Sequence, residues 1–253
     1  MPRNESAPRL TWLAPGEPFP PLSEAWGQGS PAPGLLAAGE QLDTTLLLQA
    51  YRRGIFPWFS AGQPVLWWSP DPRMALDPKA LRVHRSLRQS LRKWLALDGV
   101  ELVFDRDFAE VMNRCATQPR PGQSGSWIVP DIVRAYTGLH EQGLAHSAEL
   151  RRDGRLLAGL YFVALGHAVF GESMFTTVPD GSKLALCLLV SVARHHGVRM
   201  IDCQQNTRHL ASLGATEIPR TQFIEHLLQA QTRPPIDWAR ETLYWHELFP
   251  DQP

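Results

Sequence analysis

Three residues at the end of one short strand pattern, Asp202, Cys203 and Gln204, are the strongest candidates for chemistry. They directly follow residues 198–201, whose sequence is typical of a short strand. Because side chains alternate across a strand, Asp202 and Gln204 are expected on one face and Cys203 on the other. An acid beside an amide makes a polar opening in an apolar core, where a polar substrate group could be bound. The same residues could instead only cap the helix that follows them.

Glu172 is a second candidate because of the apolar residues around it. The strand expected over residues 167–175 would place Ala168, Phe170, Glu172 and Met174 on one face. Burying a charge without a partner costs several kcal/mol. Glu172 therefore needs either a structural cation in the protein or a cation that arrives with a substrate, and the residues alone leave both open.

Tryptophans gather in two proline-flanked segments. GIFPWFS (54–60) and LWWSPDPR (66–73) bring Trp58, Trp67 and Trp68 close together in the sequence. They form either a rigid aromatic ledge for a ligand or a plug between domains, since large aromatic side chains fill cores. A loop rich in Pro, Gly and Ser (119–126) leads to Trp127, and loops of this kind often hold binding residues.

Residues 82–95 are expected to form a helix with one apolar side and one basic side. The basic side consists of Arg82, Arg85, Arg88, Arg92 and Lys93. No acidic residue lies within this helix, although the chain has 25 basic and 25 acidic residues and no net charge. The pattern fits either a solvated surface or a phosphate-binding surface. With zero net charge, any affinity for nucleic acid must come from such a local patch.

The composition is that of an ordinary soluble globular protein, with 43% apolar and 20% charged residues among 253. Three cysteines are too few and too scattered for a disulfide framework or a metal knuckle. No apolar run is long enough to span a bilayer, and the first residues do not have the pattern of a signal peptide. We therefore expect a reduced, cytoplasmic protein that does not enter membranes.

The second half of the chain has the pattern of an α+β domain. A hairpin, a third strand, a buried helix over 183–196, a strand and another helix follow one another. This order is similar to the acyltransferase fold of the GCN5-related N-acetyltransferases, which implies a central mixed sheet flanked by helices. The usual glycine-rich loop for coenzyme A is replaced by residues 179–183 (PDGSK), which weakens a coenzyme A role. We expect four parts: a proline-rich extension (1–33), a small N-terminal α+β domain (34–72), the acyltransferase-like domain (73–233) and a C-terminal tail (234–253).

Seven motifs, taken in order, resemble the bacterial leucyl/phenylalanyl-tRNA–protein transferase family. They are GIFPWFS (54–60), LWWSPDPR (66–73), SWI (126–128), HSAEL (146–150), GESMF (171–175), IDCQ (201–204) and ASLGATEIPR (211–220). The resemblance implies transfer of leucine or phenylalanine, and methionine less well, from aminoacyl-tRNA to another protein. The acceptor would be the N-terminal α-amine of a protein that begins with Arg or Lys, and the product would carry a degradation signal.

The resemblance also implies where the donor binds. Trp58 and Trp127 would hold the 3′-terminal adenosine, and stacking of a base on an aromatic side chain is worth roughly 1–3 kcal/mol. Tyr51 and Tyr136 lie at positions that resemble its polar neighbours. The pocket for the donor side chain would be lined by Met174, Leu160 and Val169. The acceptor-stem phosphates would contact Arg85, Arg88, Arg92 and Lys93.

For the reaction, the resemblance points to Asp202 and Gln204. A primary amide is too weakly basic to remove a full proton, so Gln204 would position the amine or the carbonyl. Asp202 would orient the reacting group or relay a proton. Glu172, with help from Asp202, would hold the cationic side chain of the acceptor. Because the donor is an activated ester, neither a metal nor another cofactor is expected, and the resemblance implies a monomer.

Three other functions stay open from the sequence. A coenzyme A-dependent N-acetyltransferase would have the same fold, and so would an enzyme that transfers aminoacyl groups from tRNA to cell-wall precursors. A tRNA-binding module without catalysis is the third. Only the predicted transferase needs an acceptor with a basic first residue.

Overall fold

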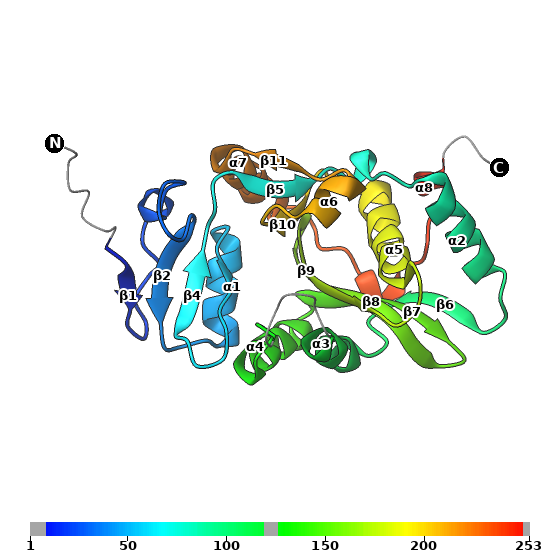
Figure 1. The fold of residues 1–253 in the computed structure, drawn as a ribbon, viewed down its shortest axis with the longest axis horizontal. Coiled ribbons are helices and arrows are strands. Elements are labelled where there is room, and N and C mark those ends of the chain that lie inside the picture. The colour runs from blue at the N-terminus through cyan, green and yellow to red at the C-terminus, as the bar shows by residue number, and fades with distance from the viewer. Residues whose placement is uncertain (1–8, 119–125, 250–253) are drawn as a thin grey trace.

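The computed structural model describes residues 9–118 and 126–249, which form an α+β fold with two sheets (Figure 1). The expected loop over 119–126 lies almost entirely outside the described residues. The smaller sheet has the strand order β1-β2-β4-β3 and the larger one the order β11-β5-β10-β9-β8-β7-β6. In the described residues no helix is both long enough and apolar enough to cross a membrane.

The smaller sheet and one helix form the N-terminal end of the molecule. Its strands are β1 (Thr11–Leu13), β2 (Leu35–Gly39), β3 (Phe56–Pro57) and β4 (Val65–Trp68). Helix α1 (Thr44–Arg52) begins at Asp43, whose side chain accepts a hydrogen bond from the Leu46 N–H, as an N-cap residue does. Strand β1 pairs with β2, so part of the proline-rich segment before residue 34 is integrated into this sheet.

The larger sheet is mixed, as expected. Its strands are β5 (Arg73–Leu76), β6 (Val100–Phe104), β7 (Ala145–Arg152), β8 (Arg155–Leu165), β9 (Ala168–Thr176), β10 (Ile201–Gln204) and β11 (Thr216–Ile218). Strands β9 and β10 are parallel and are joined by α5 (Gly181–His195), whereas the other neighbouring strands of this sheet are antiparallel. The expected α+β class, with a mixed central sheet, helices around it and a small N-terminal part, is confirmed.

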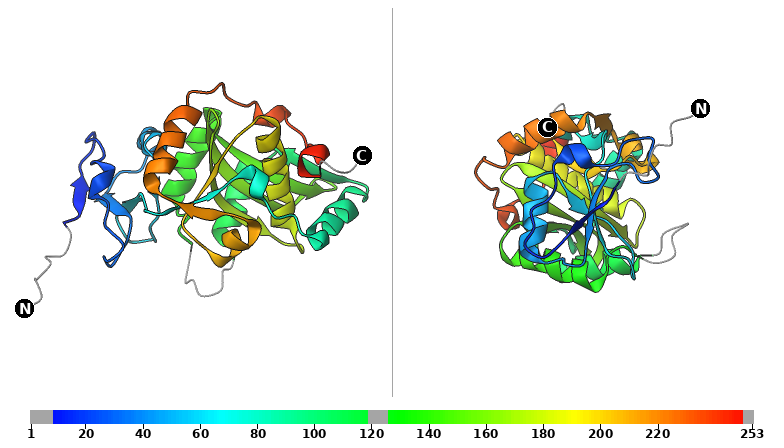
Figure 2. Two further views of the ribbon diagram at one scale, coloured as in Figure 1. Left: turned by 90° about the horizontal axis from the view of Figure 1, so that it is seen from above. Right: turned by 90° about the vertical axis from the view of Figure 1, so that its left-hand side faces the viewer.

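Helices lie on both faces of the larger sheet (Figures 1 and 2), and the described residues form two hydrophobic cores. One core contains side chains of α1, α3 (Phe108–Thr117), α4 (Pro130–Glu141) and α7 (Arg220–Ala230). The other contains α2 (Arg85–Leu95), α5, α6 (Arg208–Leu213) and α8 (Trp245–Leu248). Helix α5 is buried along most of its length, which explains its apolar residues on all sides.

Strand β9 has a β-bulge at Glu172. Tyr161 of β8 pairs with Ser173 and Phe162 pairs with Gly171, so Glu172 has no partner in the ladder. The alternation of side chains therefore changes phase there. Phe170 lies in the core of α1, α3 and α4, whereas Met174 packs against the core of α5. The expectation that Ala168, Phe170, Glu172 and Met174 share one face is wrong for this reason.

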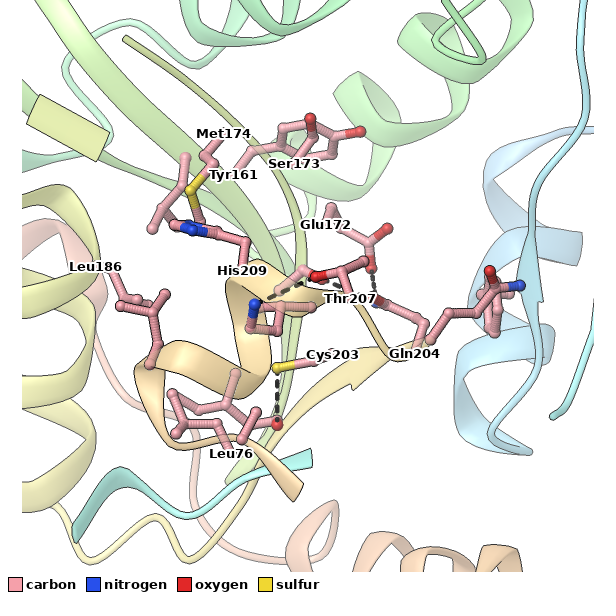
Figure 3. A pocket seen from close by; sticks show the side chains of 18 of the residues that line it. Leu76, Tyr161, Glu172, Ser173, Met174, Leu186, Cys203, Gln204, Thr207 and His209 are labelled. Atoms are coloured by element: carbon pink, nitrogen blue, oxygen red, sulfur yellow. Dashed lines mark hydrogen bonds between the residues drawn. The ribbon is translucent and has the colours of Figure 1, made fainter. Parts of the chain in front are cut away.

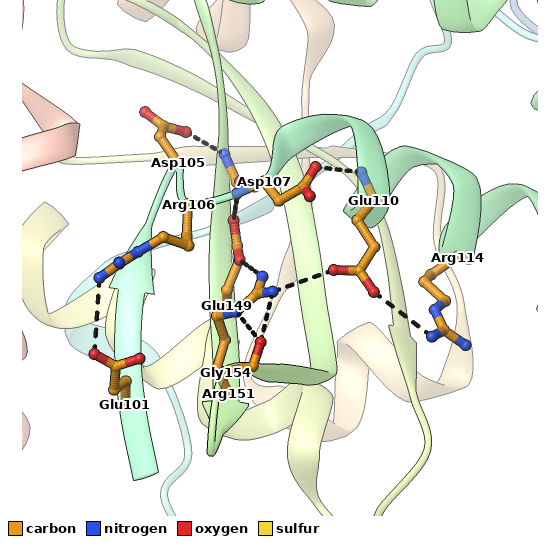
Figure 4. A network of polar contacts seen from close by, with 10 residues as sticks. Glu101, Asp105, Arg106, Asp107, Glu110, Arg114, Glu149, Arg151 and Gly154 are labelled. Carbon is orange, nitrogen blue, oxygen red and sulfur yellow. Dashed lines mark hydrogen bonds and ion pairs between the residues drawn. The ribbon is translucent and has the colours of Figure 1, made fainter. Parts of the chain in front are cut away.

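Motif HSAEL forms part of a buried ionic network at the start of α3 (Figure 4). The carboxylate of Glu149, fully buried, accepts hydrogen bonds from the Asp107 N–H (2.9 Å) and the Ser147 hydroxyl (2.8 Å). It also pairs with Arg151 (2.6 Å), which reaches Glu110 of α3 as well (3.2 Å). These contacts join α3 to β7, so we assign this motif a structural role.

The segment expected as a tail packs onto the larger sheet as far as it is described. The Trp238 ring is buried and meets the Phe162 ring edge-on at 4.8 Å between centroids. The guanidinium group of Arg88 on α2 lies 4.6 Å from the centroid of the Phe249 ring. The end of the described chain thus covers the core beside α2 and α5.

Candidate active site

A cavity of about 700 Å³ opens where β9 and β10 diverge (Figure 3). The two parallel strands pair at Ile201 with Val169 and at Asp202 with Phe170, and no further pair between them follows. Residues 171–174 of β9 form one wall of the cavity and residues 203–205 form the other. A bulge in each strand thus lies next to the opening.

Gln204 bridges the two diverging strands. Its Nε2 donates hydrogen bonds to the Gly171 carbonyl (2.9 Å) and to Glu172 Oε1 (3.2 Å). Both of these neighbours are acceptors, so the amide nitrogen must point toward them. The hydrogen bonds described for this carboxamide use only the nitrogen, so its oxygen is free to accept a bond from a substrate. The backbone of Gln204 is left-handed (φ 59°), which is uncommon for a residue other than glycine.

Cys203 faces the cavity and Asp202 faces away from it, the reverse of what the sequence predicts. The ladder between β10 and β5 shifts register between Asp202 and Gln204, so the alternation breaks. Cys203 therefore lines the cavity, and Asp202 lies beneath it with 1% of its side chain exposed. Burial raises the pKa of the Cys203 thiol to about 12, helped by the Asp202 charge, so it is a protonated thiol at neutral pH and a poor nucleophile.

Asp202 is paired with a buried arginine, a partner that sequence reasoning missed. Arg73 of β5 donates to Asp202 through Nε (2.7 Å) and Nη2 (2.6 Å), a bidentate pair with both side chains buried. Its Nη1 donates to the Gly54 carbonyl (3.1 Å). The guanidinium lies over the rings of Phe56 (4.8 Å) and Phe223 (4.5 Å). The carboxylate of Asp202 is thus neutralised within the protein.

Glu172 is held by two tyrosine hydroxyls. Tyr51 donates to Oε1 (2.6 Å) and Tyr136 donates to Oε2 (2.9 Å). Burial raises the pKa of Glu172 to about 7, and the Asp202 charge adds to this, while the two hydroxyls and Arg73 act in the opposite direction. No Lys, Arg or His among the described residues forms an ion pair with Glu172, which lines the cavity. Its carboxylate is therefore available to a cation that enters from outside.

Tyr51 and Tyr136 lie below the cavity wall. Both are fully buried, and their rings pack edge-on with centroids 6.2 Å apart. Burial and the Glu172 charge raise the pKa of each phenol well above its usual value, so both hydroxyls stay protonated; they are hydrogen-bonded to each other as well as to Glu172. The two hydroxyls support the Glu172 carboxylate from below, and neither tyrosine lines the cavity.

Trp58 and Trp127 both line the cavity, although 69 positions separate them in the sequence. Trp58 is 40% exposed and packs edge-on against Trp68, whose indole N–H donates to the Trp58 carbonyl (2.7 Å). Trp67, in contrast, is fully buried against Phe19. Within this aromatic cluster Trp58 therefore faces the cavity, whereas Trp67 fills the core; binding of a ligand by Trp58 stays a prediction.

The apolar end of the cavity includes two of the three residues expected for a side-chain pocket. Leu160 and Met174 face each other across the ladder of β8 and β9 and both line the cavity. Val169 is buried in the core and does not. Sequence reasoning missed the rest of this wall, which includes Leu76, Leu186, Leu189, Ile201, Leu210, Leu213 and Ala215. Only the uniformly apolar pattern of α5 could have indicated its contribution.

His209 of α6 is another cavity residue that sequence reasoning missed. Burial and the charge of Lys183 lower the pKa of its imidazole, so it is neutral at physiological pH. A cluster that could hold a metal lies elsewhere: donor atoms of His195, His246 and Glu247 come within 4.8 Å of one another. None of these three residues lines the cavity.

The basic side chains of α2 differ in what surrounds them. Arg85, Arg92 and Lys93 are exposed, and Arg88 is half-buried. The Arg88 and Arg92 guanidinium groups lie over the rings of Phe249 and Trp245 (4.6 and 5.6 Å). Helix α2 lies beside α5 and over the same core (Figure 1).

Family models and similar proteins match this chain along most of its length. A family model described as leucyl/phenylalanyl-tRNA protein transferase matches residues 75–228, and the model of its N-terminal domain matches residues 40–71. A protein of Polaromonas sp. (strain JS666) named leucyl/phenylalanyl-tRNA–protein transferase is 58% identical over 242 residues, covering 95% of this chain and 94% of the relative. A protein of the same name from Albidiferax ferrireducens is 52% identical, covering 96% and 95%.

Solved structures give more distant similarities. The C-terminal domain of a putative lysylphosphatidylglycerol synthetase from Agrobacterium fabrum has a TM-score of 0.34 at 17% identity, covering 78% of this chain and 61% of that one. A GCN5-related N-acetyltransferase from Kribbella flavida has a TM-score of 0.32 at 14% identity, covering 68% and 60%.

Proposed function

Because the chain belongs to the leucyl/phenylalanyl-tRNA–protein transferase family, we propose that its cavity joins leucine or phenylalanine from aminoacyl-tRNA to the N-terminal α-amine of a protein. The family and the aminoacyltransferase activity expected from the seven motifs are confirmed by the family models and the relatives. The finer proposal is that the acceptor begins with Arg or Lys and that methionine is a weaker donor. We also propose that the enzyme works as a cytoplasmic monomer.

The observation that supports this function best is the gathering of four side chains around one cavity. Glu172, Gln204, Trp58 and Trp127 come from separate parts of the sequence and line the same space. Two aromatic faces suit a nucleoside, an unpaired carboxylate suits a cation, and a carboxamide oxygen suits an N–H donor. An aminoacyl ester of adenosine supplies the nucleoside. A protein N-terminus with a basic side chain supplies the cation and the N–H donor.

On this proposal the reaction is the aminolysis of an ester. The α-amine nitrogen forms a bond to the carbonyl carbon, and the bond from that carbon to the ribose 3′ oxygen breaks. One amine proton is lost and one proton is taken up by the 3′ oxygen. The free α-amine has a pKa near 8, so a useful fraction is neutral at physiological pH. Orientation by Gln204 can then supply much of the acceleration.

The acceptor cation is assigned to Glu172 alone. Asp202 was expected to assist it, but both its oxygens are bound by Arg73 and its side chain is sealed from the cavity. An ionised Glu172 would gain a charged partner. The two tyrosine hydroxyls favour this ionised form against burial, and with a pKa of about 7 roughly half of the carboxylate is ionised at neutral pH. The donor side chain would lie at the apolar end, beside Leu160 and Met174.

A transfer assay with three matched peptides tests the function. Radiolabelled leucine or phenylalanine on tRNA is incubated with the enzyme and a peptide that begins with Arg, Lys or Ala. We expect label to enter the Arg and Lys peptides and not the Ala peptide. Equal labelling of the Ala peptide would contradict the acceptor assignment. Acetylation of the same peptides from acetyl-CoA would favour the N-acetyltransferase instead.

A further inference from the structure

Arg73 contacts two parts of the chain that meet at the candidate site. It is fully buried, and each of its three guanidinium nitrogens has an acceptor: Asp202 for Nε and Nη2, and Gly54 for Nη1. Two aromatic rings enclose its faces, one from β3 and one from α7. Gly54 belongs to the N-terminal part, and Asp202 belongs to the strand that ends at the cavity. One side chain thus connects two parts of the site.

The first connection leads to Gln204. Asp202 Oδ1, which Arg73 Nε binds, also accepts a hydrogen bond from the Gln204 N–H (3.0 Å). Gln204 has a left-handed backbone, a conformation that persists only where its surroundings enforce it. Loss of the bond to Asp202 would let this backbone relax and would turn the carboxamide away from Gly171. Arg73 therefore fixes, through Asp202, where the Gln204 oxygen faces the cavity.

The second connection leads to Trp58. Arg73 binds the carbonyl of Gly54 and packs on Phe56, which lines the cavity two residues before Trp58. Gly54 has φ 74°, and a Cβ there would come within 2.5 Å of the Ile224 side chain, so this turn approaches α7 closely. The loop that holds Trp58 is thus anchored on the same guanidinium group as the strand that holds Gln204.

We propose that Arg73 is a positioning residue that sets the placement of Gln204 relative to Trp58. In terms of the proposed function, on which this inference rests, it aligns the amine-orienting group with the tryptophan that holds the donor's adenosine. Lysine cannot replace it, because an ammonium group lacks the planar fork that binds both carboxylate oxygens and a third acceptor. The inference also gives Asp202 a role without contact to the substrate: it transmits the position of Arg73 to Gln204.

The first experiment compares Arg73→Lys with Arg151→Lys. Arg151 forms a buried pair with Glu149 outside the cavity, so it is a matched control for the loss of a buried guanidinium. Both variants are expected to lose thermal stability. Only Arg73→Lys is expected to lower kcat per folded molecule, by about 100-fold, the effect of a displacement near 1 Å at a reacting group. Equal kcat values in the two variants would overturn the inference.

A second variant keeps the test decisive if Arg73→Lys does not fold. The double substitution Arg73→Met with Asp202→Leu removes the pair without leaving a buried charge, and such replacements are often neutral or stabilising. We expect a folded protein with a kcat again lowered by about 100-fold. A folded double variant with the wild-type kcat would show that the pair is structural only.

Two measurements do not depend on the transfer reaction. Amide hydrogen exchange at Gln204 is expected to accelerate in Arg73→Lys and to stay unchanged in Arg151→Lys. A non-hydrolysable 3′-amide analogue of phenylalanyl-adenosine is expected to bind Arg73→Lys more weakly than wild type. If the wild-type protein transfers nothing to any peptide, the proposed function fails, while the exchange data still decide the positioning role. Unchanged exchange at Gln204 would overturn it.

Discussion

Replacing Tyr51 with phenylalanine should move the pH at which Glu172 ionises. The substitution removes one of the two hydroxyl donors to a carboxylate whose pKa is about 7. A hydrogen bond to a charged group contributes about 1.5–3 kcal/mol. Each pKa unit corresponds to about 1.4 kcal/mol, so the pKa should rise by about one to two units. At pH 7 the ionised fraction would fall from about one half to between about one tenth and one hundredth.

The assay is the pH dependence of kcat/KM for a peptide that begins with Arg. The ionised acid is the form that binds the acceptor cation, so kcat/KM should rise with pH as Glu172 loses its proton. For Tyr51→Phe this rise should be displaced upward by about one to two pH units. The activity at pH 7 should be roughly 5- to 50-fold lower and should recover toward pH 9. Ionisation of the acceptor amine is common to both proteins and cancels in the comparison.

A matched control is Tyr244→Phe, which also removes a hydroxyl bound to a carboxylate. Tyr244 donates to Glu241 (2.8 Å), and neither residue lines the cavity. Its pH profile should coincide with that of wild type. If Tyr51→Phe leaves the rising limb in place, or moves it to lower pH, then Glu172 is not the group that binds the acceptor.

Three further predictions concern separate parts of the site. Folded Glu172 has a pKa of about 7 against an ordinary 4.5, so the free energy of unfolding should fall as pH rises between these values. Glu172→Gln should remove this loss of stability, which is at most about 3 kcal/mol. The substitution should therefore raise Tm at pH 8 more than at pH 5. Trp58→Ala should weaken charged-tRNA binding roughly 5- to 150-fold with little change in Tm, because its ring is 40% exposed, whereas Trp67→Ala should destabilise the fold by about 3–5 kcal/mol. Arg85→Glu and Lys93→Glu should each reduce the slope of log Kd against log salt concentration by about 1, measured by titration with tRNA in increasing KCl. An unchanged slope would place the phosphate contacts elsewhere, and an equal Tm for Glu172→Gln and wild type at pH 8 would contradict the buried-acid argument.

The order of elements and the main cavity residues could be predicted from the sequence. Hydrophobic periodicity and turn residues are local signals, so the hairpin and the buried helix were predicted correctly, whereas the strand expected over 198–201 lies at Ile201–Gln204. Glu172 stood out because its neighbours are apolar. Trp58 and Trp127 were found through motifs, and their roles in adenosine binding stay predictions.

Two single-residue bulges and one long-range ion pair could not be predicted. A bulge gives no signal in the composition. Each bulge nevertheless puts the side chains that follow it on the opposite face of the sheet from the one predicted, at Glu172 and at Cys203. The partner of Asp202 is 129 positions away, in a motif singled out for its tryptophans. Arg73 was therefore visible in the sequence, but only the fold could show that it removes Asp202 from the cavity.

Because of the bulge in β9, the alternation of side chains between the two faces of the sheet changes phase at Glu172. If the same residues paired without the bulge, side chains would alternate between the two faces without interruption along the whole strand. Phe175, now buried in the core of α3 and α4, would then take the side on which Met174 lies. A benzyl group would enter the apolar end of the cavity and a thioether would replace it in the interior. Changes of donor preference should therefore arise here by substitution, because a one-residue shift in the pairing of β9 would disturb the core and the pocket together.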